Sequence, residues 1–210
     1  MKHLVIIGAG GYGREMYAAA KNAVGFGEVF DIKGYLDENP AALKGFSNYP
    51  SIIGSPSAYE PERDDVFFAA LGDLDFRRKC VAEIESKGGE FISIVSGSAF
   101  VGTNVEIGAG SFVANNVTLT ADIRIGKHVA VFHSSSVGHD SVLGDFSHVY
   151  AQCSVGGGVI IGEGARIFPG AVIVPRRKIG EYATVGAGST VIVDVEPGVT
   201  VFGSPAMELK

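Results

Sequence analysis

An aliphatic side chain recurs at every sixth position through the second half of the chain. The series has no exception over these positions: Val95, Val101, Ile107, Val113, Leu119, Ile125, Val131, Val137, Leu143, Val149, Val155, Ile161, Ile167, Ile173, Ile179, Val185 and Val191. Six residues do not match the 3.6-residue period of an amphipathic helix, but they suffice for one short strand and one tight corner. Three such segments close a coil of about eighteen residues. The series therefore predicts a rigid stack of about five to six coils around a continuous aliphatic core.

Two further phases of the repeat support this interpretation. Four residues after each aliphatic stands a small or β-branched side chain, and only Arg177 breaks this rule. Glycine directly follows nine of the aliphatics, as at Gly102 and Gly108. Since glycine tolerates positive φ, we expect these glycines to serve the corners of the coils.

The first part of the chain has a different pattern, in which apolar strands alternate with helices. The expected strands are residues 3–7, 32–36, 52–53 and 66–71, the expected helices are residues 14–23 and 76–87, and residues 91–95 lead into the repeats. Continuous apolar strands that alternate with helices are typical of a parallel α/β sheet. The sequence therefore predicts two domains, residues 1–94 and residues 95–210.

Bulk properties exclude several classes of partner. The net charge of −6, without a basic stripe, argues against a nucleic-acid surface. Cys80 and Cys153 are too few for a disulfide framework. The apolar run from His3 to Ala9 is too short for a signal peptide or a membrane span. We therefore expect a cytoplasmic protein with no nucleic-acid partner and no membrane span.

A glycine loop after the first expected strand is the first candidate binding site. Gly8, Gly10 and Gly13 match G-x-G-x-x-G between a strand and a helix, and Asp37 lies at the tip of the next strand. This context predicts that the phosphates of a nucleotide bind at the helix N-terminus, with Asp37 near a ribose hydroxyl. The alternative is that the glycines only permit a tight turn and that Asp37 only forms a turn. A hydride-transfer dehydrogenase is disfavoured because no catalytic domain of that kind follows.

Four histidines lie in the repeats, and we expect all of them to be accessible at the edges of the coils: His128, His133, His139 and His148. His139 precedes Asp140, and a carboxylate partner fixes the tautomer of an imidazole and makes it a better general base. An ordinary surface histidine is the alternative for each of them.

Zinc is the other chemistry that histidines suggest. A zinc site needs three or four converging ligands. The positions one coil away from these histidines hold Ala121, Ala130, Ala151 and Gly157, so no column of ligands forms. We therefore expect no metal ion.

Several segments together resemble the left-handed β-helix hexapeptide-repeat acyltransferases, and within them the nucleotide-sugar N-acetyltransferase and sialic acid O-acetyltransferase subgroup. These segments are Gly8–Gly13, Gly34–Pro40, Ala70–Asp73 with Arg77, His139–His148 and Gly203–Ala206. The resemblance implies a Rossmann-like α/β domain over residues 1–94 that binds a nucleotide-sugar. It implies an all-β left-handed parallel β-helix over residues 95–210 that carries acetyl transfer.

The resemblance also implies an assembly and a set of site residues. It implies a homotrimer with acetyl-coenzyme A as co-substrate in the groove between neighbouring helices. His139 is then the general base, assisted by Asp140, and Gly157 supplies the backbone amide for the oxyanion. His148, Gly157, Pro169 and Ala187 are the implied acetyl-coenzyme A contacts, and Gly10, Gly11, Tyr12, Asp37, Glu38 and Gly72 the implied substrate contacts.

The chain departs from the subgroup at two places. Some members have His where this chain has Tyr12. Members that act on a UDP-4-amino sugar have Asn seven residues before the catalytic histidine, where this chain has Phe132, followed by His133. We expect Phe132 and His133 to contact the substrate, and whether the acceptor is an amine or a hydroxyl stays open.

Three functions follow from these observations. The leading hypothesis is an acetyl-coenzyme A-dependent acetyltransferase that acts on a nucleotide-linked or free sugar for surface glycan synthesis, by direct transfer without a covalent enzyme intermediate. The alternatives are a zinc hydrolyase of the γ-carbonic anhydrase type and a non-catalytic nucleotide-sugar-binding protein. The sequence leaves the sugar and the nucleotide base open.

Overall fold

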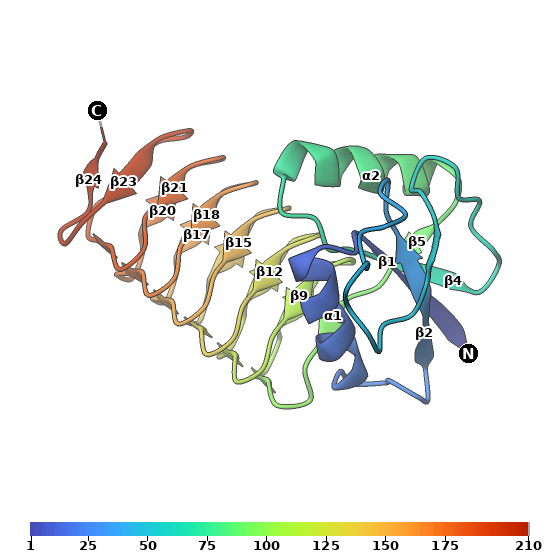
Figure 1. The fold of residues 1–210 in the computed structure, drawn as a ribbon. Coiled ribbons are helices and arrows are strands. Elements are labelled where there is room, and N and C mark those ends of the chain that lie inside the picture. Colours follow the sequence, from blue (N-terminus) through green and yellow to red (C-terminus); the bar gives the residue numbers. More distant parts are fainter. Residues whose placement is uncertain (210) are drawn as a thin grey trace. The chain divides into compact units, whose positions relative to one another are not determined.

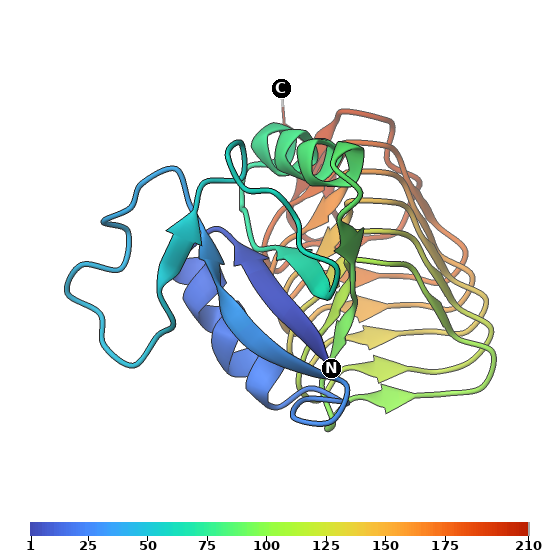
Figure 2. The ribbon, with the colours of Figure 1, turned by 90° about the vertical axis from the view of Figure 1, so that its right-hand side faces the viewer.

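The computed structural model describes residues 1–209, shown in two views in Figures 1 and 2. These residues form two compact units, divided in the sequence between Ile94 and Val95. We call them the N-terminal unit and the C-terminal unit. None of the helices within residues 1–209 is long and apolar enough to cross a membrane.

The N-terminal unit is a five-stranded parallel sheet with two helices. Its elements are β1 (Lys2–Ile7), α1 (Gly11–Lys21), β2 (Phe30–Leu36), β3 (Ile52–Gly54), β4 (Asp65–Ala69), α2 (Leu74–Ser86) and β5 (Glu90–Phe91). The strand order is β3-β2-β1-β4-β5, and all of these pairs are parallel. Its central strand β1 is fully buried from Leu4 to Ile7. The predicted parallel α/β sheet is confirmed.

Both helices begin earlier than predicted. Helix α1 begins at Gly11, inside the glycine loop, because Gly10 already serves as its N-cap. Helix α2 begins at Leu74, because the side chain of Asp73 accepts a hydrogen bond from the backbone N–H of Phe76 and so caps the first turn. Each helix therefore starts a few residues after the carboxyl end of a strand, α1 after β1 and α2 after β4.

The C-terminal unit is a parallel β-solenoid whose strands form three sheets (Figure 2). Sheet 1 contains β6 (Ile94–Val95), β9 (Phe112–Val113), β12 (Ala130–Val131), β15 (His148–Val149), β18 (Arg166–Ile167), β21 (Thr184–Val185), β23 (Thr200–Phe202) and the antiparallel β24 (Met207–Glu208). Sheet 2 contains β7 (Phe100–Val101), β10 (Thr118–Leu119), β13 (Ser136–Val137), β16 (Ser154–Val155), β19 (Val172–Ile173) and β22 (Thr190–Val191). Sheet 3 contains β8 (Glu106–Ile107), β11 (Arg124–Ile125), β14 (Val142–Leu143), β17 (Ile160–Ile161) and β20 (Lys178–Ile179).

One coil of the solenoid visits the three sheets in turn. Paired residues are 18 apart, as where Thr118 pairs with Ser136 (136 − 118 = 18). We call the turn from sheet 1 to sheet 2 corner A, the turn from sheet 2 to sheet 3 corner B, and the turn from sheet 3 to sheet 1 corner C. The predicted fold class, an α/β domain followed by a stack of hexapeptide coils, is confirmed.

The aliphatic series forms the core, except in the first coil. From Val113 onward the aliphatic residues of the series are buried, with Val113, Leu119 and Val131 fully so. Val101 is 40% exposed, because it lies in β7, the edge strand of sheet 2. The sequence predicts an aliphatic core that begins at Val95, but the buried core begins at Val113, one coil later.

The corners use positive φ at a different position from the one expected. From Asn104 to Gly188 every sixth residue has φ between 54° and 73°, and this residue stands three places after the aliphatic rather than directly after it. Ten of these fifteen residues are not glycine, and they include Asp140 and Phe146. The glycines directly after the aliphatics have another role: a Cβ at Gly144 would lie 2.7 Å from the backbone nitrogen of Glu163 in the next coil. Those glycines permit close stacking of the coils.

Glycines directly after the aliphatics and glycines at the positive-φ positions differ in how much an added side chain would destabilise the fold. Replacing Gly144 by alanine should lower the free energy of unfolding by about 1–3 kcal/mol, because the added methyl group meets backbone that cannot move aside. Replacing Gly188 by asparagine should cost less than about 1 kcal/mol, since φ there is 66°, no atom lies within 4 Å of the added Cβ, and asparagine tolerates this conformation. Denaturant unfolding of both variants checks the difference, and equal losses would contradict it.

The repeat slips by two residues in its last coil. Ile179 pairs with Val195, only 16 residues on (195 − 179 = 16), so corner B is two residues shorter there. Asp194 closes this short corner: its Oδ1 accepts a hydrogen bond of 3.0 Å from the backbone N–H of Lys178 and lies 3.6 Å from Nη1 of Arg177. The slip explains why the aliphatic series ends at Val191 and why Arg177 alone breaks the small-residue phase.

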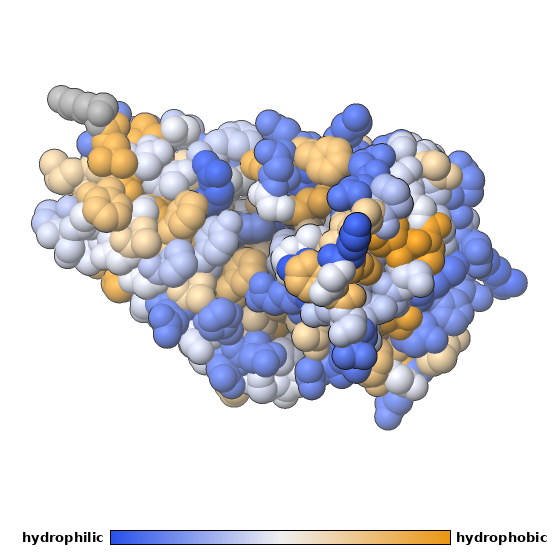
Figure 3. Space-filling model, in the orientation of Figure 1, coloured by the Kyte–Doolittle hydropathy of each residue, from blue (hydrophilic) through white to orange (hydrophobic). Residues whose placement is uncertain are grey.

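The hairpin of β23 and β24 ends the solenoid. Figure 3 shows apolar side chains gathered at this end, where Phe202 and Met207 are exposed. The ring of Phe202 occupies the space that a Cβ at Gly186 would need. The hairpin therefore continues sheet 1 beyond its last regular coil.

Candidate functional site

His139 and Asp140 form a close pair on corner B, between β13 and β14. Nδ1 of His139 lies 2.6 Å from Oδ2 of Asp140, and both side chains are about two-thirds exposed, at 69% and 67%. Asp140 has φ of 59°, a conformation that aspartate adopts more readily than most residues. An imidazole that donates its Nδ1 proton to a carboxylate presents Nε2 as an acceptor. With its proton on Nδ1, His139 would therefore present Nε2 as a hydrogen-bond acceptor.

Gly157 lies at the same corner one coil later (157 − 139 = 18). A Cβ at this position would lie 2.7 Å from Nε2 of His139, so any residue other than glycine would force the imidazole to move. The backbone N–H of Gly158 donates to the carbonyl oxygen of His139 over 2.7 Å and holds the two coils together. The structure therefore brings three predicted residues, His139, Asp140 and Gly157, to one point.

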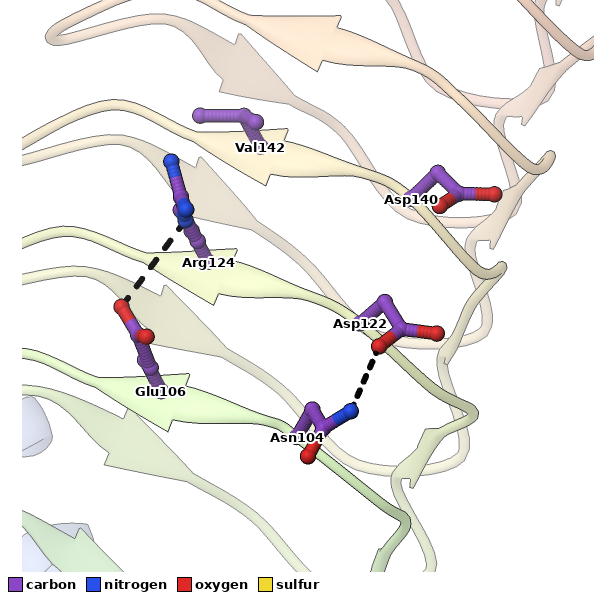
Figure 4. A pocket seen from close by; sticks show the side chains of 6 residues that line it. All are labelled: Asn104, Glu106, Asp122, Arg124, Asp140 and Val142. Atoms are coloured by element: carbon purple, nitrogen blue, oxygen red, sulfur yellow. Dashed lines mark hydrogen bonds and ion pairs between the residues drawn. The ribbon is translucent and has the colours of Figure 1, made fainter.

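A polar hollow extends from Asp140 toward the first coils of the solenoid (Figure 4). Its volume is about 350 Å³, and its lining residues are Asn104, Glu106, Asp122, Arg124, Asp140 and Val142. Asn104 donates to Asp122 over 2.8 Å, and Arg124 lies 3.9 Å from Glu106. The sequence prediction missed this hollow. The sequence does contain a pattern that indicates the hollow: Asn104, Asp122 and Asp140 follow one another at intervals of 18 residues and so share one corner.

His148 lies in a different environment from the one predicted. It belongs to β15 of sheet 1 and is only 5% exposed, since its ring packs edge-on against Phe132 and Tyr150 at centroid distances of 6.0 and 5.7 Å. His128 is also buried, at 4% exposure, and stacks on Phe146 at 4.8 Å. The expectation that all four histidines are accessible is therefore wrong for His128 and His148. It is confirmed for His133 and His139, which are exposed.

Corner A carries a column of stacked rings. Phe132 lies over Tyr150 at 5.3 Å with an interplanar angle of 5°, and Tyr150 over Phe168 at 5.0 Å and 18°. Phe132 is 8% exposed as a result. This column explains how Phe132 is accommodated, because Phe132 belongs to a ladder of rings that continues through the next two coils.

The remaining predicted residues of the solenoid also lie on corner A. His133, Pro169 and Ala187 are exposed there, one above another at multiples of 18 residues. Corner A joins sheets 1 and 2, whereas His139 lies at the junction of sheets 2 and 3. A single chain therefore presents two separate groups of predicted residues, one with His139 on corner B and one on corner A and sheet 1.

The glycine loop of the N-terminal unit follows β1. Gly8 has φ of 98°, and a Cβ at Gly13 would overlap the carbonyl oxygen of Gly8, so both positions require glycine. Asp37 follows β2, and its two carboxylate oxygens accept 2.8 Å hydrogen bonds from the backbone N–H groups of Ala9 and Asn39. Asp37 thus forms the turn that the sequence allowed as an alternative, and in addition it ties that turn to the glycine loop.

The main chain is open where a ligand would approach the N-terminal unit. A Cβ at Gly10, Gly11 or Gly72 would meet no atom within 4 Å. Gly10 and Gly11 follow β1 and Gly72 follows β4, so they flank the point where the strand order reverses, which is where open α/β sheets bind ligands. Glu38 is exposed and Tyr12 half-buried near the same ends of the strands.

Neither cysteine nor a metal cluster offers other chemistry. Burial raises the pKa of the Cys80 thiol to about 11 and also raises the pKa of the Cys153 thiol, so neither forms a thiolate nucleophile at neutral pH. Within residues 1–209, no group of three or more His, Cys, Asp and Glu side chains is placed to hold a metal ion.

Two family models match the chain. The PglD N-terminal domain matches residues 3–84, and the bacterial transferase hexapeptide (six repeats) matches residues 158–192. Among curated proteins, an uncharacterised protein L142 of Acanthamoeba polyphaga mimivirus is 29% identical over 96 residues. The match covers 46% of this chain and spans only about a fifth, 19%, of that relative's length.

Solved structures resemble the whole chain. The acetyltransferase domain of PglB from Neisseria gonorrhoeae is 28% identical with a TM-score of 0.87, and the match covers 100% of both chains. The same domain has been solved in complex with acetyl coenzyme A. A mutant of perosamine N-acetyltransferase from Caulobacter crescentus, in complex with CoA and GDP-perosamine, is 27% identical with a TM-score of 0.89, covering 100% of this chain and 98% of that one. Together with the two family models, these likenesses place the chain among the PglD-like hexapeptide-repeat acetyltransferases.

Proposed function

We propose that this protein is an acetyl-coenzyme A-dependent N-acetyltransferase that acts on a nucleotide-linked amino sugar. The observation that carries the proposal is the arrangement on corner B, where Nε2 of a carboxylate-paired His139 lies 2.7 Å from the position that a Cβ of Gly157 would take. The PglB domain binds acetyl coenzyme A, and the perosamine enzyme was captured with CoA and GDP-perosamine in variants in which one histidine is replaced. These relatives support both substrates.

The geometry supports a direct transfer. The amine nitrogen of the sugar attacks the thioester carbonyl, and Nε2 of His139 takes the proton that the nitrogen loses. Asp140 stabilises the imidazolium that forms. The backbone N–H of Gly157 donates to the oxyanion of the tetrahedral intermediate. When the intermediate collapses, the carbon–sulfur bond breaks and coenzyme A leaves with the proton, so no covalent enzyme intermediate is needed.

The polar hollow beside Asp140 supports an amine acceptor over a hydroxyl. Its lining includes the carboxylates of Asp122, Glu106 and Asp140, with Arg124 as the single cation among its lining residues. An amino sugar arrives as an ammonium ion, which such a surface attracts, and it must become neutral before attack. One relative is itself named a perosamine N-acetyltransferase, which agrees with this choice.

A homotrimer would complete the site. His148, Pro169 and Ala187 lie on sheet 1 and corner A, away from His139 on corner B of the same chain. If acetyl-coenzyme A lies between two copies, corner B of one copy and corner A of its neighbour flank it together. The same arrangement would bring Phe132 and His133 of one copy near the acceptor bound at the other.

The N-terminal unit would hold the nucleotide. The backbone N–H groups of Gly10, Gly11 and Tyr12, at the start of α1, suit the diphosphate. Asp37 and Glu38 are placed for the ribose, and Gly72 leaves room beside the diphosphate. Because acetyl-coenzyme A and nucleotide-sugars are made inside the cell, the reaction belongs in the cytoplasm.

A substrate screen tests the function. The protein is incubated with acetyl-coenzyme A and GDP-, UDP-, dTDP- or CMP-linked amino sugars, and thiol release and the mass of the sugar product are measured. We expect release with at least one of them, and a product heavier by one acetyl group. Nucleotide-sugar binding without thiol release would instead favour a non-catalytic binding protein, and stoichiometric zinc with hydration of carbon dioxide would favour the hydrolyase.

A further inference from the structure

The backbone N–H of Gly157 lies in a run of three glycines, Gly156–Gly158. It makes no hydrogen bond within residues 1–209, whereas both neighbouring N–H groups donate to backbone carbonyl groups of adjoining coils, over 2.9 and 2.7 Å. The amide left available is the one that the proposed reaction uses for its oxyanion. Because glycine has more backbone freedom than any other residue, contacts from outside the run must hold this N–H in one direction.

Ser141 supplies such a contact from the coil before. Its side chain is fully buried at corner B, and it directly follows Asp140 in the sequence. Oγ of Ser141 donates to the carbonyl oxygen of Gly156 over 3.1 Å and accepts from the backbone N–H of Val159 over 3.3 Å. The hydroxyl therefore bridges the two ends of the corner that contains Gly157.

This bridge acts on the peptide group that carries the N–H of Gly157. The carbonyl of Gly156 and the N–H of Gly157 belong to one planar trans peptide, so they point in opposite directions. Since the buried hydroxyl of Ser141 holds the oxygen toward the interior of the corner, the N–H is directed toward the outside. A donor on the carbonyl oxygen also polarises the peptide, and this strengthens the N–H as a donor.

Corner C contains the same bridge and shows what such a peptide binds. Ser111, also fully buried, donates to the carbonyl oxygen of Gly126 over 2.8 Å and accepts from the N–H of Val129 over 3.0 Å. The N–H of the bridged peptide belongs to Lys127, and it donates to the carboxylate of Asp145 over 2.8 Å. At that corner the bridged peptide thus binds a negatively charged oxygen from within the chain.

We propose that Ser141 is a positioning residue for acetyl transfer, because it aims and polarises the N–H of Gly157 toward the oxyanion that forms on the thioester carbonyl. On corner B this transient oxyanion takes the place that the carboxylate of Asp145 takes on corner C. The proton of Ser141 stays on its hydroxyl throughout, so Ser141 is neither a base nor a nucleophile. The inference rests on the proposed acetyl-coenzyme A-dependent function.

The chain itself shows which residues the position of Ser141 tolerates. Alanine fills the same phase of the repeat, fully buried, at Ala165, Ala171 and Ala183. Cysteine fills it at Cys153, whose Sγ lies 3.2 Å from the carbonyl oxygen of Phe168, the equivalent of Gly156. Ser141→Ala should therefore fold without the bridge, and Ser141→Cys should fold with part of it.

The test compares two serines that form the same bridge at different corners. Ser141→Ala is expected to lower kcat by about tenfold and to change KM by less than about twofold. A misaligned oxyanion donor costs less than the loss of the whole donor, which costs about 10²–10³-fold in kcat. Ser111→Ala is the matched control, which should lower the melting temperature by a similar amount and leave kcat unchanged. Ser141→Cys should return kcat to within about threefold of the wild type.

A second background separates the oxyanion from the base. With His139→Ala already present, Ser141→Ala should still lower the residual rate by about tenfold, since an oxyanion donor acts without the base. If the effect disappears there, Ser141 acts through the neighbouring His139–Asp140 pair. If Ser111→Ala and Ser141→Ala lose kcat equally, the bridge has only a general role in folding. Either result, or an unchanged kcat in Ser141→Ala, overturns the assignment.

Amide hydrogen exchange gives a readout that does not depend on turnover. We expect the N–H of Val159 to exchange at least about tenfold faster in Ser141→Ala than in the wild type, because it loses its acceptor. If the wild type turns over no amino sugar but this difference appears, the proposed function fails and the hold of Ser141 on the glycine corner stands. Equal exchange in both proteins would refute that hold, whether or not the protein is active.

Discussion

Replacing His139 by alanine is expected to lower kcat by about 10²–10⁴-fold, the usual contribution of a positioned general base. The loss should appear in kcat, because His139 acts on the proton of the attacking amine rather than on ground-state binding. Since the side chain is 69% exposed, the melting temperature should not change. Stopped-time assays of thiol release, together with titration of coenzyme A, separate the chemical step from binding.

The N-terminal unit provides a matched control for this variant. His3 and Asp31 form a pair with the same 2.6 Å distance between Nδ1 and a carboxylate oxygen, and both are partly exposed, at 41%. This pair lies at the amino ends of β1 and β2, whereas the glycine loop follows their carboxyl ends. His3→Ala should therefore keep full activity. A similar loss in both variants would mean that His–Asp pairs of this chain matter for folding, not for proton transfer.

The six-residue period predicts which residues share a corner with His139, but not how the side chains around the other histidines pack. The six-residue period places His139 and Gly157 at one corner, since they are 18 residues apart. In the structure Nε2 of His139 lies 2.7 Å from the position that a Cβ of Gly157 would take. The same count would have found the hollow, because Asn104 and Asp122 share the corner with Asp140. The period alone is therefore sufficient to bring the polar residues of the hollow together, as it is for His139 and Gly157.

Other features depend on side-chain packing that a period does not encode. The burial of His128 and His148 comes from rings in the same or the next coil, such as Phe146 and Tyr150, and not from their phase in the repeat. The role of the glycines after the aliphatics was misjudged for a similar reason. Their φ is ordinary, and the constraint comes from the backbone of the neighbouring coil, which no local pattern reports.

Replacing Gly157 by alanine is expected to lower kcat by about 10²-fold without loss of folding. The added Cβ would lie 2.7 Å from Nε2 of His139, so the imidazole must move, and a displacement of about 1 Å is enough to cost that much in a positioned group. The backbone N–H remains in the variant. If Gly157 acted only through that amide, alanine would keep most of the activity, and the contact with His139 would have no catalytic consequence.

A double-mutant cycle gives this prediction its control. In the His139→Ala background the space of the imidazole is empty, so the Cβ that Gly157→Ala adds no longer meets the ring. The second substitution should then change the residual rate by less than about threefold. Additive losses would instead show that Gly157→Ala disturbs the coil itself, independently of the ring. Non-additivity therefore distinguishes a glycine that makes room for the base from one that only shapes the solenoid.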